Sequence, residues 1–240
     1  MPKLPISLSS FLAASRRESY AQFRGDYSRG RNSFIIATTE PKFLLPALNA
    51  RAIDKVPGFS INDAAILTLA NGHKELFLDP QLRKYREAHL AFLDAIGIKF
   101  DKSEIAALDS DHAYPTSAAI GTIGMVKMNL ISREVNRSFG AGWEKRLTHD
   151  RPDSELKRGE LAALLKALDV SLSDSKNPER SLKLGGEQLI ALGYAALAER
   201  KFLLEQVEQC MLDKQTQDEN YAVATGQINL EPGQPLIPEE

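Results

Sequence analysis

Hydrophobic residues recur along this chain mainly at the spacing of amphipathic helices. The pattern predicts helices over residues 11–23, 60–69, 80–96, 154–168 and 186–211. Ser9 or Ser10 is a candidate cap for the first helix, and Gly97 is a candidate stop for the third. Residues 33–39 are rich in β-branched residues and predict a buried strand or an extended docking segment. From about Lys214 the chain is polar and contains three prolines, which predicts a disordered or loosely docked tail.

These elements predict an α+β protein that is mainly α-helical. We expect a small embedded ββα element, which is a β-hairpin followed by a helix, and a C-terminal helical hairpin. The expected regions are a mainly helical N-terminal region at 1–108, the candidate ββα element at 109–150, the helical hairpin at 151–214 and the polar tail at 215–240. The helical hairpin is expected to complete the core and, as an alternative, to bind a protein partner.

Overall charge gives no argument for nucleic-acid binding, because the net charge of the 240 residues is only −2. A local basic segment is present at residues 16–31, where five arginines outnumber two acidic residues and alternate with aromatic rings. Such a segment suits phosphate contact and base stacking. Arg16, Arg17 and Arg24 are therefore candidate nucleic-acid contacts, and the alternative is a solvated helix end followed by a turn.

Cysteine content and hydropathy narrow the class of protein further. The single cysteine, Cys210, excludes an intrachain disulfide and a cysteine-rich zinc site, so no zinc is expected. No apolar run approaches the roughly 20 residues that span a bilayer, and the N-terminus lacks the apolar region of a signal peptide. We therefore expect a cytoplasmic protein without a membrane partner, with delivery by a dedicated secretion machine left open.

The chemistry of the chain is concentrated around Asp111 and His112. If this pair ends a strand, it places a carboxylate next to an imidazole, which can serve as a metal ligand and a general base. An apolar run at 123–131 predicts a second strand, and Ser132 can cap a following helix. That helix carries Asn136, whose amide oxygen can bind a cation, and it also carries Arg133 and Arg137.

This arrangement resembles the HNH branch of the His-Me finger (ββα-metal) nucleases. The matching residues are Asp111-His112, Pro115-Thr116-Ser117, Asn129-Leu130 and Asn136-Arg137-Ser138. The resemblance implies that His112 activates water, that Asp111 and Asn136 bind Mg²⁺ or Mn²⁺, and that Asn129 supports the catalytic site. The backbone of DNA or RNA would then be positioned by Arg133, Arg137 and Lys145, and Lys127 is a further candidate contact.

Some features depart from the family pattern. Asn136 follows Asn129 after only seven positions, and the usual spacing would make Lys127 the middle residue of the motif. The segment also fits a plain loop in which an aspartate caps a helix and His112 bonds a backbone carbonyl. The sequence thus predicts a metal-dependent nuclease. Its alternative is a non-catalytic subunit of a mobile-element or defence assembly that binds nucleic acid or protein.

Overall fold

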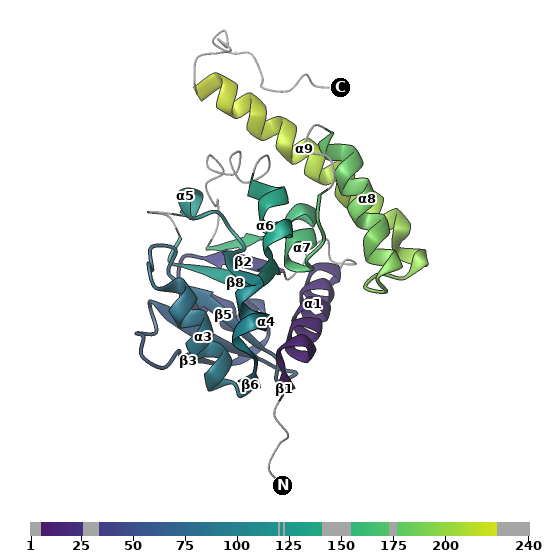
Figure 1. Ribbon diagram of the computed structural model, residues 1–240. Coiled ribbons are helices and arrows are strands. Elements are labelled where there is room, and N and C mark those ends of the chain that lie inside the picture. Colours follow the sequence, from purple (N-terminus) through teal and green to yellow (C-terminus); the bar gives the residue numbers. More distant parts are fainter. Residues whose placement is uncertain are drawn as a thin grey trace.

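The structure is a computed structural model that describes residues 6–25, 34–119, 121, 123–140, 155–172 and 177–224. In chain order, its elements are β1 (Ile6–Ser7), α1 (Leu8–Arg24), β2 (Ile35–Thr38), the 3-10 helix η2 (Pro41–Phe43), α2 (Leu44–Ala47), β3 (Ala50–Lys55), β4 (Ala64–Leu69), β5 (Lys74–Leu78), α3 (Tyr85–Ala95), β6 (Ile98–Lys99), α4 (Lys102–Ala106), β7 (Leu108–His112), α5 (Thr116–Ala119), β8 (Met125–Ser132), α6 (Arg133–Gly140), β9 (Leu156–Arg158), α7 (Leu161–Ala167), α8 (Pro178–Ala191), the 3-10 helix η4 (Leu197–Glu199) and α9 (Arg200–Ala224) (Figure 1).

A curled sheet of seven antiparallel strands forms the centre of the fold. Its order is β3-β4-β5-β8-β2-β9, and β7 pairs with the C-terminal part of β8. The sheet curls into a half-barrel, and helices account for 49% of the structure against 23% for strands. The prediction of a mainly helical protein was therefore wrong, because the sheet is too large to be a small embedded element.

Strand β4 shows why the helical prediction failed. Residues 60–69 were predicted to be a helix, but Ala64–Leu69 pairs with β3 on one side and with β5 on the other. Nearly all of β4 is buried, since Ala64 and Ile66 face one core cluster while Ala65 and Leu67 face another. A strand that is covered on both faces has no alternation of polar and apolar residues, so its sequence does not reveal the strand period.

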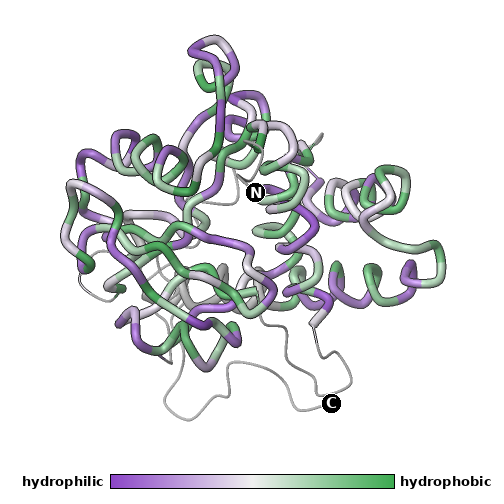
Figure 2. The backbone as a smooth tube through the Cα atoms, turned by 90° about the horizontal axis from the view of Figure 1, so that it is seen from below, coloured by the Kyte–Doolittle hydropathy of each residue, from purple (hydrophilic) through white to green (hydrophobic). Residues whose placement is uncertain are grey.

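Three hydrophobic clusters fill the space around the sheet. Helices α1 and α3 cover one region of it, α2 covers a second, and α6, α7, α8 and α9 enclose a third together with the C-terminal half of α1. The hydropathy colouring in Figure 2 shows hydrophobic and hydrophilic residues alternating along the helical coils. Each helix thus buries its apolar side against the sheet or another helix, as amphipathic helices do.

Several helix boundaries differ from the sequence-based ones. Helix α1 begins after Ser7, whose side chain accepts a hydrogen bond from the backbone N–H of Ser10. The C-terminal hairpin is formed by α8 and α9, whereas the predicted first member of that hairpin is the shorter helix α7, which packs on α1 (Figure 1). Helix α9 continues to Ala224, into the region predicted as a polar tail, and residues 225–240 lie outside the described part.

None of the helices in the described ranges combines the length and the apolar character needed to cross a bilayer.

Candidate functional site

The expected strand–strand–helix order is present over residues 108–140. Strands β7 and β8 form an antiparallel pair in which Asp111 lies opposite Asn129 and His112 lies opposite Met128. Helix α6 begins at Arg133, directly after β8 ends at Ser132. The order β7, β8, α6 is the one that the motif predicted, but α5 lies between the two strands and β8 also pairs with β5 and β2, so the three elements belong to the large sheet and do not form a small embedded unit.

Within this element, Asp111 and His112 point to opposite faces of β7. The Oδ2 atom of Asp111 lies 2.9 Å from Nζ of Lys166 in α7, and both side chains are largely buried. The ring of His112 packs instead beside Tyr85 of α3, with 5.3 Å between the ring centroids. Since neighbouring residues of a strand alternate between its faces, the carboxylate and the imidazole do not meet at one site.

The amide of Asn136 contacts a different aspartate from the one predicted. Its Nδ2 donates a hydrogen bond of 3.2 Å to Oδ2 of Asp109, and Arg133 lies 3.5 Å from the other oxygen of that carboxylate. The structure therefore brings Asp109, Asn136 and Arg133 together but places His112 on the other side of the strand. In the described ranges, no group of three or more His, Cys, Asp or Glu residues is placed to hold a metal ion.

The seven predicted nucleic-acid contacts fall into four sets. Arg17, Arg133 and Arg137 are exposed and could reach an external phosphate. Arg16 and Arg24 instead form ion pairs with Asp169 and Glu199, at 2.7 Å and 2.5 Å. Lys127 is buried, which removes it from any external phosphate, and Lys145 lies outside the described residues.

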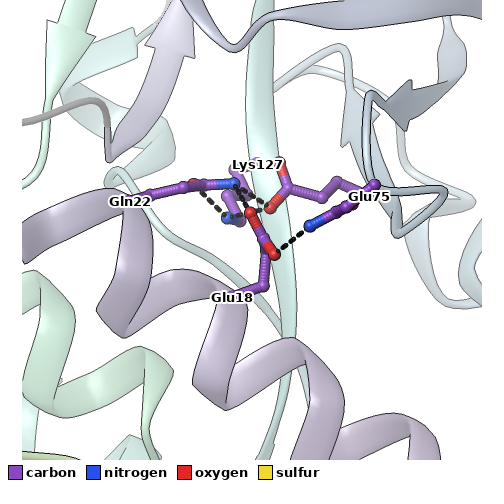
Figure 3. A network of polar contacts seen from close by, with 5 residues as sticks. Glu18, Gln22, Glu75 and Lys127 are labelled. Atoms are coloured by element: carbon purple, nitrogen blue, oxygen red, sulfur yellow. Dashed lines mark hydrogen bonds and ion pairs between the residues drawn. The ribbon is translucent and has the colours of Figure 1, made fainter. Parts of the chain in front are cut away.

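Lys127 belongs to a buried polar network between α1, β5 and β8 (Figure 3). Its Nζ donates to Oε1 of Glu75 at 2.7 Å and to Oε1 of Gln22 at 3.3 Å. The amide nitrogen of Gln22 donates to the same Glu75 oxygen at 2.8 Å and faces Glu18 at 3.4 Å. One carboxylate oxygen of Glu75 thus accepts two hydrogen bonds, and Glu75 and Lys127 neutralise each other.

A cavity of about 40 Å³ lies beside this network. We call it the α1–β5 cavity, and its polar lining comes from α1, β5, α3 and β8. The polar residues that matter here are Ser15, Arg16, Glu75, His89, Lys127 and Asn129. Phe11 and Phe92 supply apolar walls, with their ring centroids 6.0 Å apart. The cavity combines apolar walls with several polar groups, as small-molecule sites do.

Five polar atoms in this lining have no hydrogen-bond partner within the described part of the chain. They are Ser15 Oγ, Arg16 Nε, Glu75 Oε2, His89 Nδ1 and Asn129 Nδ2. Glu75 is 5% exposed and His89 is 3% exposed, so bulk water does not solvate them freely. Buried polar groups in proteins are nearly always hydrogen-bonded, so five unpartnered ones around one cavity set this place apart.

Three of the formal charges that line the cavity are compensated. Glu75 is paired with Lys127, and the guanidinium of Arg16 is paired with Asp169. Burial lowers the pKa of His89 to about 3, with smaller contributions from Arg86 and His112, so its imidazole is neutral at neutral pH. Lys74 also lines the cavity, is partly exposed and forms no ion pair within the described part of the chain. A molecule in the deeper part of the cavity, beside Glu75, Lys127 and Arg16, would therefore meet hydrogen-bonding groups whose formal charges are balanced.

No motif in the sequence points to this cavity, although two charged residues of its lining stand out in the sequence. Lys127 interrupts the apolar run Met-Val-Lys-Met, and Glu75 directly precedes the apolar run Leu-Phe-Leu; both runs become buried strands. A charged residue inside such a run predicts a buried partner of opposite charge. The partner itself could not be identified, because β5 and β8 are far apart in the chain.

Comparisons with protein-family models, with curated proteins and with solved structures found no match to this chain.

Proposed function

We propose that this protein binds a small polar molecule in the α1–β5 cavity. The observation that carries the proposal is that five unpartnered, buried polar atoms all belong to residues that line one cavity. These residues come from α1, β5, α3 and β8. Leaving a buried donor or acceptor unpaired costs about 1–3 kcal/mol. A ligand that satisfies several of these groups would recover much of that cost, which is a driving force for specific binding.

The size of the cavity limits what can enter. A single water needs about 10–15 Å³ of such space, so the α1–β5 cavity accommodates about three waters or one small functional group. Ordered waters are the competing occupants, since buried waters commonly satisfy otherwise unpaired groups. Binding is therefore expected to involve a ligand whose polar group replaces these waters and reproduces their hydrogen bonds.

Saturation-transfer NMR of the full chain against pools of small polar fragments tests the proposal. Fragments that bind in the cavity should give a clearly weaker signal in Asn129→Ala, which removes one of the unpartnered groups. They should keep it in Asn62→Ala, the same substitution at an exposed residue. A protein that binds no fragment, or binds equally in both variants, would contradict the proposal.

A second candidate function is metal-dependent cleavage of DNA or RNA, and the β7–β8–α6 order favours it. In this hypothesis a divalent metal would bind the carboxylate of Asp111 together with Asn136, and His112 would activate water. It requires these side chains to leave their present partners, because Asp111 contacts Lys166, His112 packs on Tyr85 and Asn136 bonds Asp109. Nuclease assays on plasmid, single-stranded DNA and RNA with Mg²⁺, Mn²⁺ or EDTA compare wild type with His112→Ala. Cleavage that needs metal and is lost in the variant supports this candidate.

Lys166 offers a sharper test of the same candidate. Its ammonium group lies 2.9 Å from Asp111 and would compete with a metal ion for that carboxylate. Lys166→Met should then tighten Mn²⁺ binding, which is measured by paramagnetic line broadening, whereas Lys183→Met on α8 should not. If Lys166→Met only lowers stability and leaves Mn²⁺ binding unchanged, the ion pair has a structural role.

A further inference from the structure

Resting on the proposed function, we infer that the α1–β5 cavity selects an uncharged amide-type group, such as a primary carboxamide or a urea. The inference depends on two properties of the lining. The formal charges of Glu75, Lys127 and Arg16 are already paired, which leaves only the partly exposed Lys74, and the unpartnered atoms include hydrogen-bond donors as well as acceptors.

The charge pairing argues against a charged ligand. A carboxylate in the cavity would lie next to Glu75, and an ammonium would lie next to Lys127 and Arg16. Either ion would also lose its hydration on entering a space walled by Phe11 and Phe92. Because burial of an unpaired charge is strongly unfavourable, a neutral molecule is preferred over its charged analogues.

The unpartnered atoms specify which groups the neutral molecule must carry. Glu75 Oε2 can only accept a hydrogen bond, so the ligand needs a donor. Arg16 Nε and Asn129 Nδ2 donate, so the ligand also needs an acceptor. Ser15 and the neutral His89 can complement either kind of group. An N–H and a carbonyl on one small planar unit meet both requirements, which is the chemistry of a carboxamide or a urea.

Three probes that have nearly the same shape but different charges show how the charge of a ligand affects its binding. Acetamide is neutral, acetate carries a negative charge and acetamidinium carries a positive charge. We propose titrating each into isotope-labelled full-length protein and following the side-chain N–H resonances of Asn129 and Gln22 and the Nε–H resonance of Arg16 by NMR. Acetamide should shift these resonances saturably, with a dissociation constant on the order of a millimolar for so small a molecule.

Variants assign the response to the cavity. Asn129→Ala should weaken acetamide binding about fivefold, the effect expected for the loss of one hydrogen bond. Asn62→Ala, at an exposed turn before β4, should leave the affinity unchanged. Because Asn129 is also half-buried in β8, a thermal unfolding curve of each variant checks that the fold is retained.

The outcomes distinguish this inference from the proposed function. Acetamide binding that exceeds acetate and acetamidinium binding at least several-fold supports the inference. If acetate or acetamidinium shifts the cavity resonances more strongly than acetamide, the ligand class is wrong but the cavity is still a binding site. If none of the probes or fragments shifts them, the cavity holds ordered waters only, and both the inference and the proposed function fail.

Discussion

Glu75 and Lys127 are the two formal charges buried most deeply in the sheet, at 5% and 4% exposure. Taking both groups out of water is costly, and their contact at 2.7 Å together with the amide of Gln22 offsets that cost. The pair therefore contributes little net stability. Removing only one of the two charged side chains, however, leaves the other as a buried charge that nothing neutralises.

A double-mutant cycle tests this account of the pair. Lys127→Met alone should lower the free energy of unfolding by about 3–5 kcal/mol, because it leaves the Glu75 carboxylate uncompensated. Adding Glu75→Gln to it should recover a large part of the loss, since no buried charge remains. Urea denaturation of wild type, both single variants and the double variant measures the coupling. Additive losses would mean that the two side chains do not depend on each other.

The residues of the Asp111-His112 motif and those of the α1–β5 cavity could not be predicted from the sequence equally well. The Asp111-His112 pair could be recognised in the sequence. Because neighbouring residues of a strand face opposite sides, however, Asp111 contacts Lys166 on one face and His112 packs beside Tyr85 on the other. A sequence motif does not fix the register of a strand, and a shift of the register by one residue moves every side chain of the strand to the opposite face of the sheet. The cavity groups come from distant segments, so only the fold brings them together.

Two adjacent glycines of α8 show how helix packing depends on single positions. A Cβ atom at Gly185 would lie 2.6 Å from Cδ1 of Leu165, which is fully buried in α7. A Cβ atom at Gly186 would meet nothing closer than 3.7 Å, at Leu203 of α9. Gly185 therefore permits the close approach of α8 to α7, whereas Gly186 leaves room for a methyl group.

These contacts predict opposite effects for the same substitution. Gly186→Ala should stabilise the protein by about 0.5–1 kcal/mol, because alanine reduces the backbone entropy that a helix must lose. Gly185→Ala gains the same helical term but overpacks the contact with Leu165, which costs about 1–3 kcal/mol. Thermal unfolding of the two variants should rank Gly185→Ala as the less stable one. Equal melting temperatures would show that α7 and α8 can separate at little cost.

At the scale of elements, the amphipathic segments were the predictable part. The helix ending near Gly97 and the strand within residues 33–39 are present as α3 and β2. Strands β4 and β5 were missed because their burial on both faces removes the alternation that identifies a strand. Non-local pairing such as that between β5 and β8 has no local sequence signature, which is why a mainly helical fold was predicted.

At the scale of the whole molecule, α1 is the element that joins the parts. Its N-terminal half packs in the cluster shared with α3, and its C-terminal half packs in the cluster shared with α7, α8 and α9. Ion pairs from Arg16 and Arg24 connect it to Asp169 and to Glu199 at the start of the last helices. Two of the three arginines of α1 that suggested a nucleic-acid surface, Arg16 and Arg24, thus hold the helix in place, whereas Arg17 is exposed. The cavity is lined by the same helix.

Because His89 is buried under this arrangement, the stability of the whole molecule should depend on pH. Burial lowers the pKa of His89 to about 3 in the folded state, whereas an unfolded histidine has a pKa near 6.5. Above pH 6.5 the imidazole is neutral in both states and contributes no pH dependence. Between about pH 6.5 and 3 the unfolded state binds a proton that the folded state does not bind, so stability falls as the pH falls.

The expected contribution is a slope of about 1.4 kcal/mol per pH unit once the pH is well below 6.5. Urea denaturation between pH 7 and pH 5 measures it above the range in which most carboxylates titrate. His89→Gln cannot take up the proton, so its free energy of unfolding should change less over this interval than that of wild type. The difference should reach on the order of 1–2 kcal/mol at pH 5. Parallel curves for the two proteins would mean that the folded state protonates His89 as readily as the unfolded state, and the buried, neutral imidazole assigned to the cavity wall would then be wrong.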